Sequence, residues 1–362
     1  MGSAFDAASA AVRPLDEVAM AEARARQDRL TKPRGALGRL EDLSVQLAGI
    51  AGVCPPPVPA PAAVVVFAAD HGVVAEGVTP WPQEVTAQMV ANFVSGGAAI
   101  NVLARSVGAS VTVVDVGVAT PLPAACDGAP GLLRHPLGAG TANIAVAPAM
   151  DFATCRAALD LGAGLAADLA ADASPGAQVL VTGDMGIGNT TPAAALVAAF
   201  TGRPPLEVTG RGTGIDDAGL AVKRAVVERA LARHADAVAA GPIETLAALG
   251  GYEIAALAGF IVGGAAAGVP VLVDGLIADA ALLAAERLVP GVAARCMAGH
   301  RSVEPGAAAV LEELGLVPVL DLDMRLGEGS GACLALPVVQ AAARVLIEMA
   351  TFDAAGVTDK DG

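Results

Sequence analysis

The sequence is poor in aromatic residues and in lysine. Phe, Trp and Tyr make up 2% of its 362 residues, and 37 acidic side chains against 22 Lys and Arg give a formal net charge of −15. Proteins that bind nucleic acid need a basic surface and stacking rings, so this class of function is excluded. An anionic ligand would have to be held by arginine, by N–H groups at helix N-termini, or by one of the three lysines, Lys32, Lys223 and Lys360.

Several catalytic and targeting patterns are also missing. The chain has no Walker A loop, no GxGxxG spacing, no HExxH and no GxSxG elbow, so the common dinucleotide, metal-dependent and serine-hydrolase interpretations lack their motifs. Its five cysteines are far apart and form no CxxC, which is typical of reduced thiols in a cytosolic protein. The N-terminus has no basic stretch followed by an apolar run, so we expect no signal peptide and a cytoplasmic location.

One uncharged segment, residues 254–273, reaches the length of a transmembrane helix. Ala and Gly dominate this segment, and Gly268-Val269-Pro270 interrupts it shortly before its end. This pattern favours a buried helix followed by a short buried strand, so we expect no membrane span.

Beyond residue 61, short β-branched runs alternate with Ala-rich stretches. The alternation is typical of βα units and predicts an α/β fold with a parallel sheet. The expected strands lie in VVVFAADHG, VTVVDVG, VLVTGDMG, VLVDG, VLDLDMRLGEG and a weaker VAARCMAG. Upstream of them, the first fifty residues predict two amphipathic helices, and the proline-rich segment 54–63 marks a candidate domain boundary.

Acidic residues end most of these runs, and Gly follows within a few positions. The acids are Asp70, Asp115, Asp184, Asp274 and the pair Asp321 and Asp323. Because the carboxyl ends of parallel strands meet at the edge where open α/β folds bind ligands, we expect these carboxylates there. Asp and Gly also end strands for reasons of turn chemistry, so the repetition supports the fold more than a particular site.

The first of three Gly-rich loops spans residues 183–192 and reads GDMGIGNTTP. Asn189 or Thr190 suits an N-cap and Pro192 suits a first helical turn, so the loop predicts an anion cradle at a helix N-terminus. Without a GK[ST] sequence, a monophosphate is the more natural ligand.

The other two Gly-rich loops bring a charged residue each. Lys223 follows the loop 210–217 by one to two helical turns, and it is either a ligand for an anion or a solvated helix residue. Glu328 stands between glycines in the loop 325–331, and it is either a helix-capping carboxylate or one that a ligand approaches closely. No His, Cys, Asp or Glu spacing indicates a metal site, so we expect neither a metal nor another cofactor.

Eight segments, in order and across nearly the whole chain, resemble the nicotinate-nucleotide:dimethylbenzimidazole phosphoribosyltransferase family. They are TKPRGALGRLEDL, DHGVVAEGVTPWPQEVTAQMV, SGGAAINVLAR, GTANIA, GDMGIGNTTPAAAL, GRGTGIDDAGLAVK, GHRSVEPG and DLDMRLGEGSGACLAL. The resemblance implies a Rossmann-like parallel sheet with helices on both faces in residues 61–302. It further implies a small helical domain built from residues 1–60 and 303–362, and a homodimer.

The same resemblance implies the reaction. Phosphoribosyl would pass from nicotinate mononucleotide to 5,6-dimethylbenzimidazole, giving nicotinate and the α-ribazole 5′-phosphate used for the lower ligand of cobalamin. The leaving group departs neutral at its ring nitrogen, so the reaction needs no acid to protonate it. Direct attack on the opposite face of the sugar would account for inversion.

Roles can be assigned by the resemblance to particular residues. Glu328 corresponds to the general base, with Asp184, which stands where relatives can have Glu, and Lys223 in support. The phosphate and ribose are expected to lie against Gly186, Ile187, Gly188, Asn189, Thr190, Lys223 and Ser302. Gln83 and Leu326 are expected in the benzimidazole pocket.

Two alternatives share the same loops. A non-catalytic nucleotide sensor would keep the cradle and would not need the Glu328 loop. A related phosphoribosyltransferase would act on another base or on a phenol. Release of nicotinate would distinguish an enzyme from the sensor. A panel of acceptor bases would distinguish a dimethylbenzimidazole enzyme from one that acts on another base or a phenol.

Overall fold

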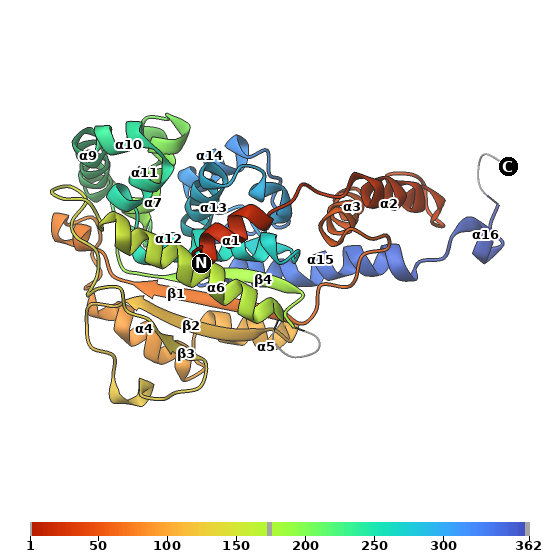
Figure 1. The fold of residues 1–362 in the computed structure, drawn as a ribbon, viewed down its shortest axis with the longest axis horizontal. Coiled ribbons are helices and arrows are strands. Elements are labelled where there is room, and N and C mark those ends of the chain that lie inside the picture. The colour runs from red at the N-terminus through yellow and green to blue at the C-terminus, as the bar shows by residue number, and fades with distance from the viewer. Residues whose placement is uncertain (1, 172–175, 359–362) are drawn as a thin grey trace.

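Six parallel strands form the central sheet of the computed structural model, which describes residues 2–171 and 176–358. The strand order is β3-β2-β1-β4-β5-β6, and each neighbouring pair is parallel (Figure 1). The strands are β1 (Ala62–Ala69), β2 (Ser110–Gly117), β3 (Leu132–Arg134), β4 (Val179–Met185), β5 (Val271–Val273) and β6 (Cys296–Ala298). The predicted α/β fold with a Rossmann-like parallel sheet is therefore confirmed.

Different helices cover the two faces of the sheet. Because side chains alternate along a strand, Val65 and Phe67 of β1 face one core while Val64 and Val66 face the other. The first core is closed by α6 (Phe152–Ala171), α7 (Thr190–Thr201), α11 (Pro242–Leu249), α12 (Tyr252–Ala266) and α13 (Leu276–Leu288). The second is closed by α3 (Arg39–Ala51), α4 (Glu84–Val94), α5 (Ala99–Val107) and α15 (Ser330–Glu348).

Six further elements complete the large α/β region. They are η1 (Gly72–Glu76), η2 (Ala124–Cys126), α8 (Pro205–Val208), α9 (Asp217–Arg233), α10 (Ala235–Ala240) and η3 (Val292–Arg295).

The uncharged segment 254–273 is a core helix followed by a core strand. It falls in α12 and β5, and the α12 side chains from Tyr252 to Ala265 are all buried. Helix α12 packs tightly against α6, since a Cβ added at Gly162 would lie 1.9 Å from the carbonyl oxygen of Ala256. The prediction of a buried helix and a short buried strand is confirmed.

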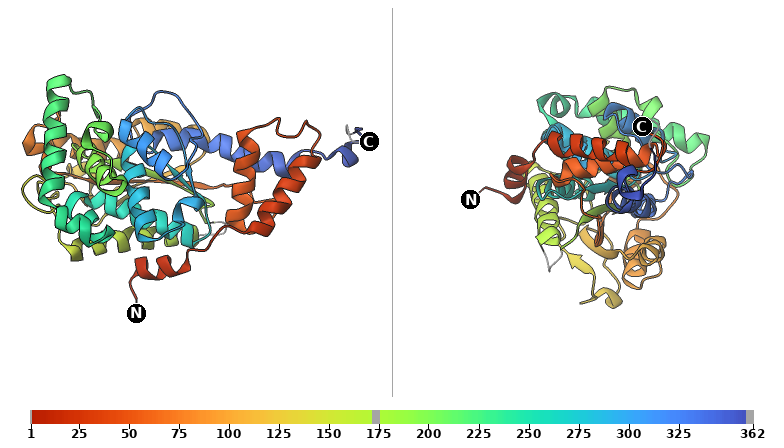
Figure 2. Two further views of the ribbon diagram at one scale, coloured as in Figure 1. Left: turned by 90° about the horizontal axis from the view of Figure 1, so that it is seen from above. Right: turned by 90° about the vertical axis from the view of Figure 1, so that its right-hand side faces the viewer.

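A helical extension lies beyond the end of the sheet. It contains α2 (Glu17–Arg29), α3, the C-terminal half of α15 and α16 (Phe352–Ala355) (Figures 1 and 2). Its small apolar core joins both ends of the chain and consists of Ala19, Ala23, Val45, Ala48 and Leu346. Arg26 of α2 reinforces this contact by donating a hydrogen bond to the carbonyl oxygen of Leu346 at 2.5 Å.

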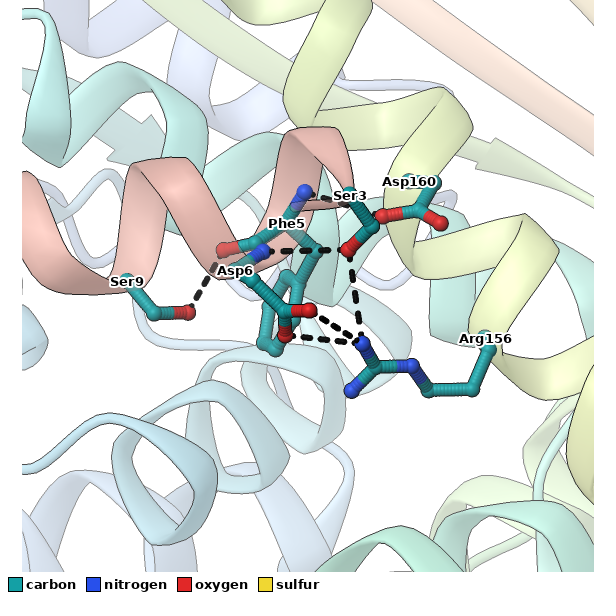
Figure 3. Close-up of polar contacts among 6 residues, drawn as sticks. All are labelled: Ser3, Phe5, Asp6, Ser9, Arg156 and Asp160. Carbon is teal, nitrogen blue, oxygen red and sulfur yellow. Dashed lines mark hydrogen bonds and ion pairs between the residues drawn. The ribbon is translucent and has the colours of Figure 1, made fainter. Parts of the chain in front are cut away.

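Helix α1 (Ala4–Ala11), inside the expected helical-domain range 1–60, lies elsewhere. It packs against α6 and α12 of the large region. Figure 3 shows how it is fixed: Arg156 forms an ion pair with Asp6 at 2.7 Å, and the N–H of Phe5 donates to Asp160 at 2.9 Å. The first fifty residues thus contain three helices where the sequence pattern predicts two, and α1 is the additional one.

The C-terminal range 303–362 is divided in the same way. Helix α14 (Pro305–Glu313) packs against α7, α8 and α13 of the large region, whereas the end of α15 joins the helical extension. Part of the range 303–362 therefore packs on helices of the large region, and the domain boundaries stay a prediction.

One expected strand is absent from its predicted place. The run Val319 to Glu328 forms no extended strand, and Leu320 makes a single parallel bridge to His300. The segment instead crosses the ends of β5 and β6, where the N–H of Val319 donates to Ala298 and that of Leu320 to Gly299. The sixth strand is β3, which the sequence analysis does not predict.

Candidate active site

The acids that end β1, β2, β4 and β5 do meet at the carboxyl edge of the sheet, but they have different tasks. Asp115 accepts hydrogen bonds from the N–H groups of Gly117 and Val118, and Asp70 accepts one from Ala119. These two carboxylates therefore shape turns. Asp184 and Asp274 instead lie beside the loop that carries Glu328.

Glu328 is a buried carboxylate on a strained loop. Its backbone is in the left-handed region with φ 63°, flanked by Gly327 and Gly329 at φ 83° and 87°. A non-glycine residue in this region costs roughly 1–2 kcal/mol, so the surrounding contacts must hold it there. The residue is 5% exposed, and its Oε2 accepts a hydrogen bond from the N–H of Ile100, in the first turn of α5, at 3.3 Å.

The electrostatic surroundings favour proton uptake by Glu328. Burial is the largest cause that raises the pKa of this carboxyl above its ordinary value, and the nearby Asp274 carboxylate raises it further. The N–H of Ile100 acts in the opposite direction because it stabilises the charged form. A carboxylate with a raised pKa is a stronger base than an exposed one.

Asp274 holds the Glu328 loop from the end of β5. Its Oδ2 accepts from the N–H of Gly329 at 3.2 Å, and its Oδ1 accepts from those of Gly331 and Ala332 at 2.8 and 3.0 Å. The carboxylate is fully buried and caps the N-terminus of α15 from another part of the chain. The sequence marks Asp274 as a strand-ending acid, and the structure gives it this second task.

Asp184 joins the Glu328 loop to the first Gly-rich loop. Its carbonyl oxygen accepts from the N–H of Glu328 at 3.3 Å, and its Oδ2 accepts from the Asn189 side chain at 3.0 Å. Burial, followed by the nearby Asp274 and Glu253 carboxylates, raises the pKa of Asp184 well above its ordinary value. Asn189 stands at the N-cap position of α7, but its side chain serves Asp184 and forms no capping bond.

A cavity of about 70 Å³, here called the inner cavity, opens between these loops. It brings together five residues predicted for the site: Asp184, Asn189, Thr190, Ser302 and Leu326. The remaining lining residues are Gly212, Thr213, Gly275, Leu276, Ile277, His300, Glu304, Arg325 and Gly327. Sites for small molecules occupy roughly 300–1,000 Å³, so a nucleotide enters only when neighbouring side chains move. One of the lining residues, Leu326, is 55% exposed.

Lys223 lies directly behind the wall of the inner cavity. Its ammonium donates to the Thr190 hydroxyl at 2.7 Å and to the carbonyl oxygen of Gly210 at 3.1 Å. The side chain is 1% exposed, so it is not a solvated helix residue. Burial lowers the pKa of Lys223 to about 8, while the Glu304 carboxylate acts in the opposite direction.

Glu304 is a site residue to which the sequence analysis assigns no role. Its Oε1 accepts from the N–H of Gly212 at 2.8 Å, and Arg325 donates to the carbonyl oxygen of the same Gly212 at 2.8 Å. These bonds fix the second Gly-rich loop against the inner cavity. The motif GHRSVEPG contains this glutamate, but nothing in the spacing indicates that it reaches back to residue 212.

Six predicted residues do not line the inner cavity: Glu328, Lys223, Gly186, Ile187, Gly188 and Gln83. Glu328 follows the lining residue Gly327 and Lys223 lies behind Thr190, whereas the other four lie farther along the sheet edge. Gly186 packs against Ala69, and the N–H of Ile187 donates to the Thr86 hydroxyl at 3.1 Å. Gly188 packs against Val74, and the Gln83 amide at the start of α4 donates to the carbonyl oxygen of His71 at 3.4 Å. This part of the first Gly-rich loop is therefore held by β1 and the segment that follows it.

A buried hydrogen bond supports that contact, and the sequence analysis does not predict it. His71 Nε2 lies 2.7 Å from Glu253 Oε1, and both side chains are at most 1% exposed. A Cβ added at Gly186 would lie 3.3 Å from His71 Nε2, so the pair packs directly under the first Gly-rich loop. Within residues 2–171 and 176–358, no group of three or more His, Cys, Asp or Glu side chains is arranged to hold a metal ion.

Comparison with known proteins places the chain in a family. A phosphoribosyltransferase family matches residues 12–357. A nicotinate-nucleotide–dimethylbenzimidazole phosphoribosyltransferase of Salinispora tropica is 57% identical over 97% of this chain and 98% of its own length. A protein of the same name from Roseiflexus sp. is 56% identical over 97% of each chain. The crystal structure of the enzyme of that name from Thermus thermophilus has 49% identity and a TM-score of 0.88, covering 95% of this chain and 100% of its own.

Proposed function

The chain belongs to the nicotinate-nucleotide–dimethylbenzimidazole phosphoribosyltransferase family and is a phosphoribosyltransferase, and we propose that it acts by direct inverting displacement with Glu328 as the general base. The donor is nicotinate mononucleotide and the acceptor is 5,6-dimethylbenzimidazole. The products are α-ribazole 5′-phosphate and nicotinate. The homodimer and the cytoplasmic location stay predictions.

The observation that carries the proposed mechanism is the state of Glu328. Its carboxylate is buried, its pKa is raised by that burial, and its backbone is fixed by bonds to Asp184 and Asp274 on either side. Within the described residues, only the N–H of Ile100 donates to this carboxylate, and it does so to Oε2. Oε1 therefore stays available to accept a proton from a bound substrate.

In the proposed step, the acceptor nitrogen that carries a lone pair attacks C1′ of the ribose. The C1′–N bond to nicotinate breaks as the new bond forms, and its electron pair neutralises the pyridinium nitrogen. The other ring nitrogen of the acceptor loses its proton to Glu328. Attack from the face opposite the leaving group converts the β-nucleotide into the α-product, and a positioned base of this kind contributes typically 10²–10⁴-fold.

We assign the phosphate to the region of Lys223, Thr190 and Ser302. Thr190 and Ser302 line the inner cavity, and the Lys223 ammonium lies 2.7 Å behind the Thr190 hydroxyl. A charged donor strengthens a hydrogen bond to phosphate and places the sugar for attack. Because Glu304 opposes the effect of burial on the pKa of Lys223, it helps to keep the lysine charged at neutral pH.

The acceptor base is assigned to the apolar part of the same cavity. Leu276, Ile277 and Leu326 line it, so several benzimidazoles should be accepted, with the methylated one preferred. An aliphatic wall cannot satisfy the polar edges of adenine, and each unpaired buried group costs roughly 1–3 kcal/mol. Adenine should therefore be a poor acceptor.

The direct test supplies nicotinate mononucleotide with equal concentrations of dimethylbenzimidazole and adenine, and separates the products by chromatography. We expect nicotinate release and mostly the dimethylbenzimidazole product in the α configuration. Mostly adenine product would contradict the assigned acceptor. Nucleotide binding without release of nicotinate, for every base in a panel, would favour a sensor.

A further inference from the structure

A second cavity lies on the outer side of the second Gly-rich loop. This outer cavity has a volume of about 340 Å³ and shares Glu304 and Arg325 with the inner cavity. Gly212 and Thr213 of the loop line the inner cavity, whereas its Gly210, Arg211 and Gly214 line the outer one. The remaining lining residues are Thr209, Leu220, Arg224, Val303 and Pro305.

The outer cavity is basic in a strongly acidic chain. Three of its lining residues are arginines, Arg211, Arg224 and Arg325, against one carboxylate, Glu304. Arg211 is already paired with the exposed Asp217. Arg224 and Arg325 form no ion pair with any residue in the described ranges, and Arg325 gives one hydrogen bond to the carbonyl oxygen of Gly212.

Buried polar atoms in this cavity lack partners. The Thr209 side chain is 0% exposed, and its hydroxyl has no hydrogen-bond partner among the described residues. The Nε of Arg224 and the Oε2 of Glu304 are likewise buried without a partner there. Each such atom costs roughly 1–3 kcal/mol unless something pairs with it. These three atoms belong to residues that line the cavity but have almost no accessible surface themselves, so a ligand reaches them only when these side chains turn.

We propose that the outer cavity is a second anion site, which binds inorganic phosphate that retains a proton. Arg224 and Arg325 supply the positive charge, and Thr209 donates its hydroxyl to a phosphate oxygen. The P–O–H group donates to Glu304 Oε2, which would otherwise repel an anion. Sulfate has the same shape but carries no proton at neutral pH, so the site should discriminate between the two.

Occupancy of the outer cavity should influence the inner one. Arg325 holds the carbonyl oxygen of Gly212, and Glu304 holds the N–H of the same residue. A phosphate that engages both side chains competes with these bonds, and Gly212 lines the inner cavity. Inorganic phosphate should therefore inhibit with a component that saturating nicotinate mononucleotide does not remove.

The test is a calorimetric titration with inorganic phosphate or sulfate at pH 7, with and without saturating nicotinate mononucleotide. We expect phosphate to bind the nucleotide-loaded protein at least tenfold more tightly than sulfate. Arg224→Gln should weaken phosphate binding about tenfold, whereas Arg233→Gln, an exposed residue on the same helix, should not. Glu304→Gln should remove the preference over sulfate.

Several outcomes would overturn the second site. Loss of phosphate binding on loading with nucleotide would show one shared site. Equal binding of phosphate and sulfate, or unchanged binding in Arg224→Gln, would show non-specific association with basic side chains. The comparison of phosphate with sulfate needs no variant, so it stands even if a substitution impairs folding. It can also be made on the nucleotide-free protein, so a failure of nicotinate mononucleotide to bind would count against the proposed function alone.

Discussion

Glu328 and Lys223 carry opposite charges, and both are buried beside the inner cavity. Burial raises the pKa of Glu328 and lowers that of Lys223 to about 8, so in both cases it disfavours the charged form. For Glu328 the neighbouring Asp274 adds to the shift, whereas for Lys223 the neighbouring Glu304 opposes it. The comparison teaches that, in the proposed mechanism, the same burial serves a base on one side and a phosphate-binding cation on the other, according to the nearest charge.

If this comparison is right, changes on the Glu328 side should act on kcat and changes on the Lys223 side on KM. Glu328→Gln should have the largest effect, a loss of kcat of about 10² or more, because only the proton acceptor is removed. The dissociation constant for nicotinate mononucleotide, measured by calorimetry, should stay within about threefold. Turnover close to that of the unmodified enzyme would contradict the base assignment.

Lys223→Ala should act mainly on KM. Hydrogen bonds to charged groups contribute about 1.5–3 kcal/mol, so the KM for nicotinate mononucleotide should rise by roughly tenfold to a hundredfold. In the unmodified enzyme the same KM should rise above about pH 8, since the ammonium form is lost as pH passes through its pKa. Unchanged kinetics in the variant would separate Lys223 from the phosphate. The matched control Arg233→Gln on the same helix should change neither constant.

Asp274→Asn should lower turnover less than Glu328→Gln does. One of the two side-chain positions would become a donor facing the N–H of Gly329 or of Gly331 and Ala332, so the Glu328 loop would lose part of its support. We expect kcat to fall about tenfold, as for loss of one or two such bonds, with KM little changed. Loss of the negative charge should also lower the pKa of Glu328, and so shift the acidic limb of the kcat profile to lower pH. A fall in thermal stability without that shift would leave Asp274 a purely structural cap.

Much of this arrangement can be predicted from the sequence, and each failure has a physical reason. Lys223 could have been placed, because Leu220, Val227 and Ala230 put the buried face of α9 at its position. The left-handed backbone conformation of Glu328 could not have been predicted, because a glutamate between glycines has no intrinsic preference for it. The apolar run before Glu328 looks like a strand, but it crosses the edge of the sheet because the residues at the end of β6 already present their carbonyl groups to Val319 and Leu320.

Long-range partners were the other missing information. The docking of α1 on the large region depends on contacts such as Arg156 with Asp6, and that of α14 on packing against α7 and α13. Glu304 reaches Gly212 across 92 positions of the chain, and no local pattern encodes such a distance.

The pH dependence of kcat tests the central claim most directly. In the unmodified enzyme, corrected for ionisation of the free substrates, kcat should fall as pH decreases through a pKa above the ordinary value for glutamate, because the base must be unprotonated. Glu328 is faced by Asp184, Asp274 and the N–H of Ile100, and none of these changes when it is replaced. In Glu328→Gln the residual turnover should therefore lose this acidic limb. A limb that persists at the same pH in the variant would contradict Glu328 as the base.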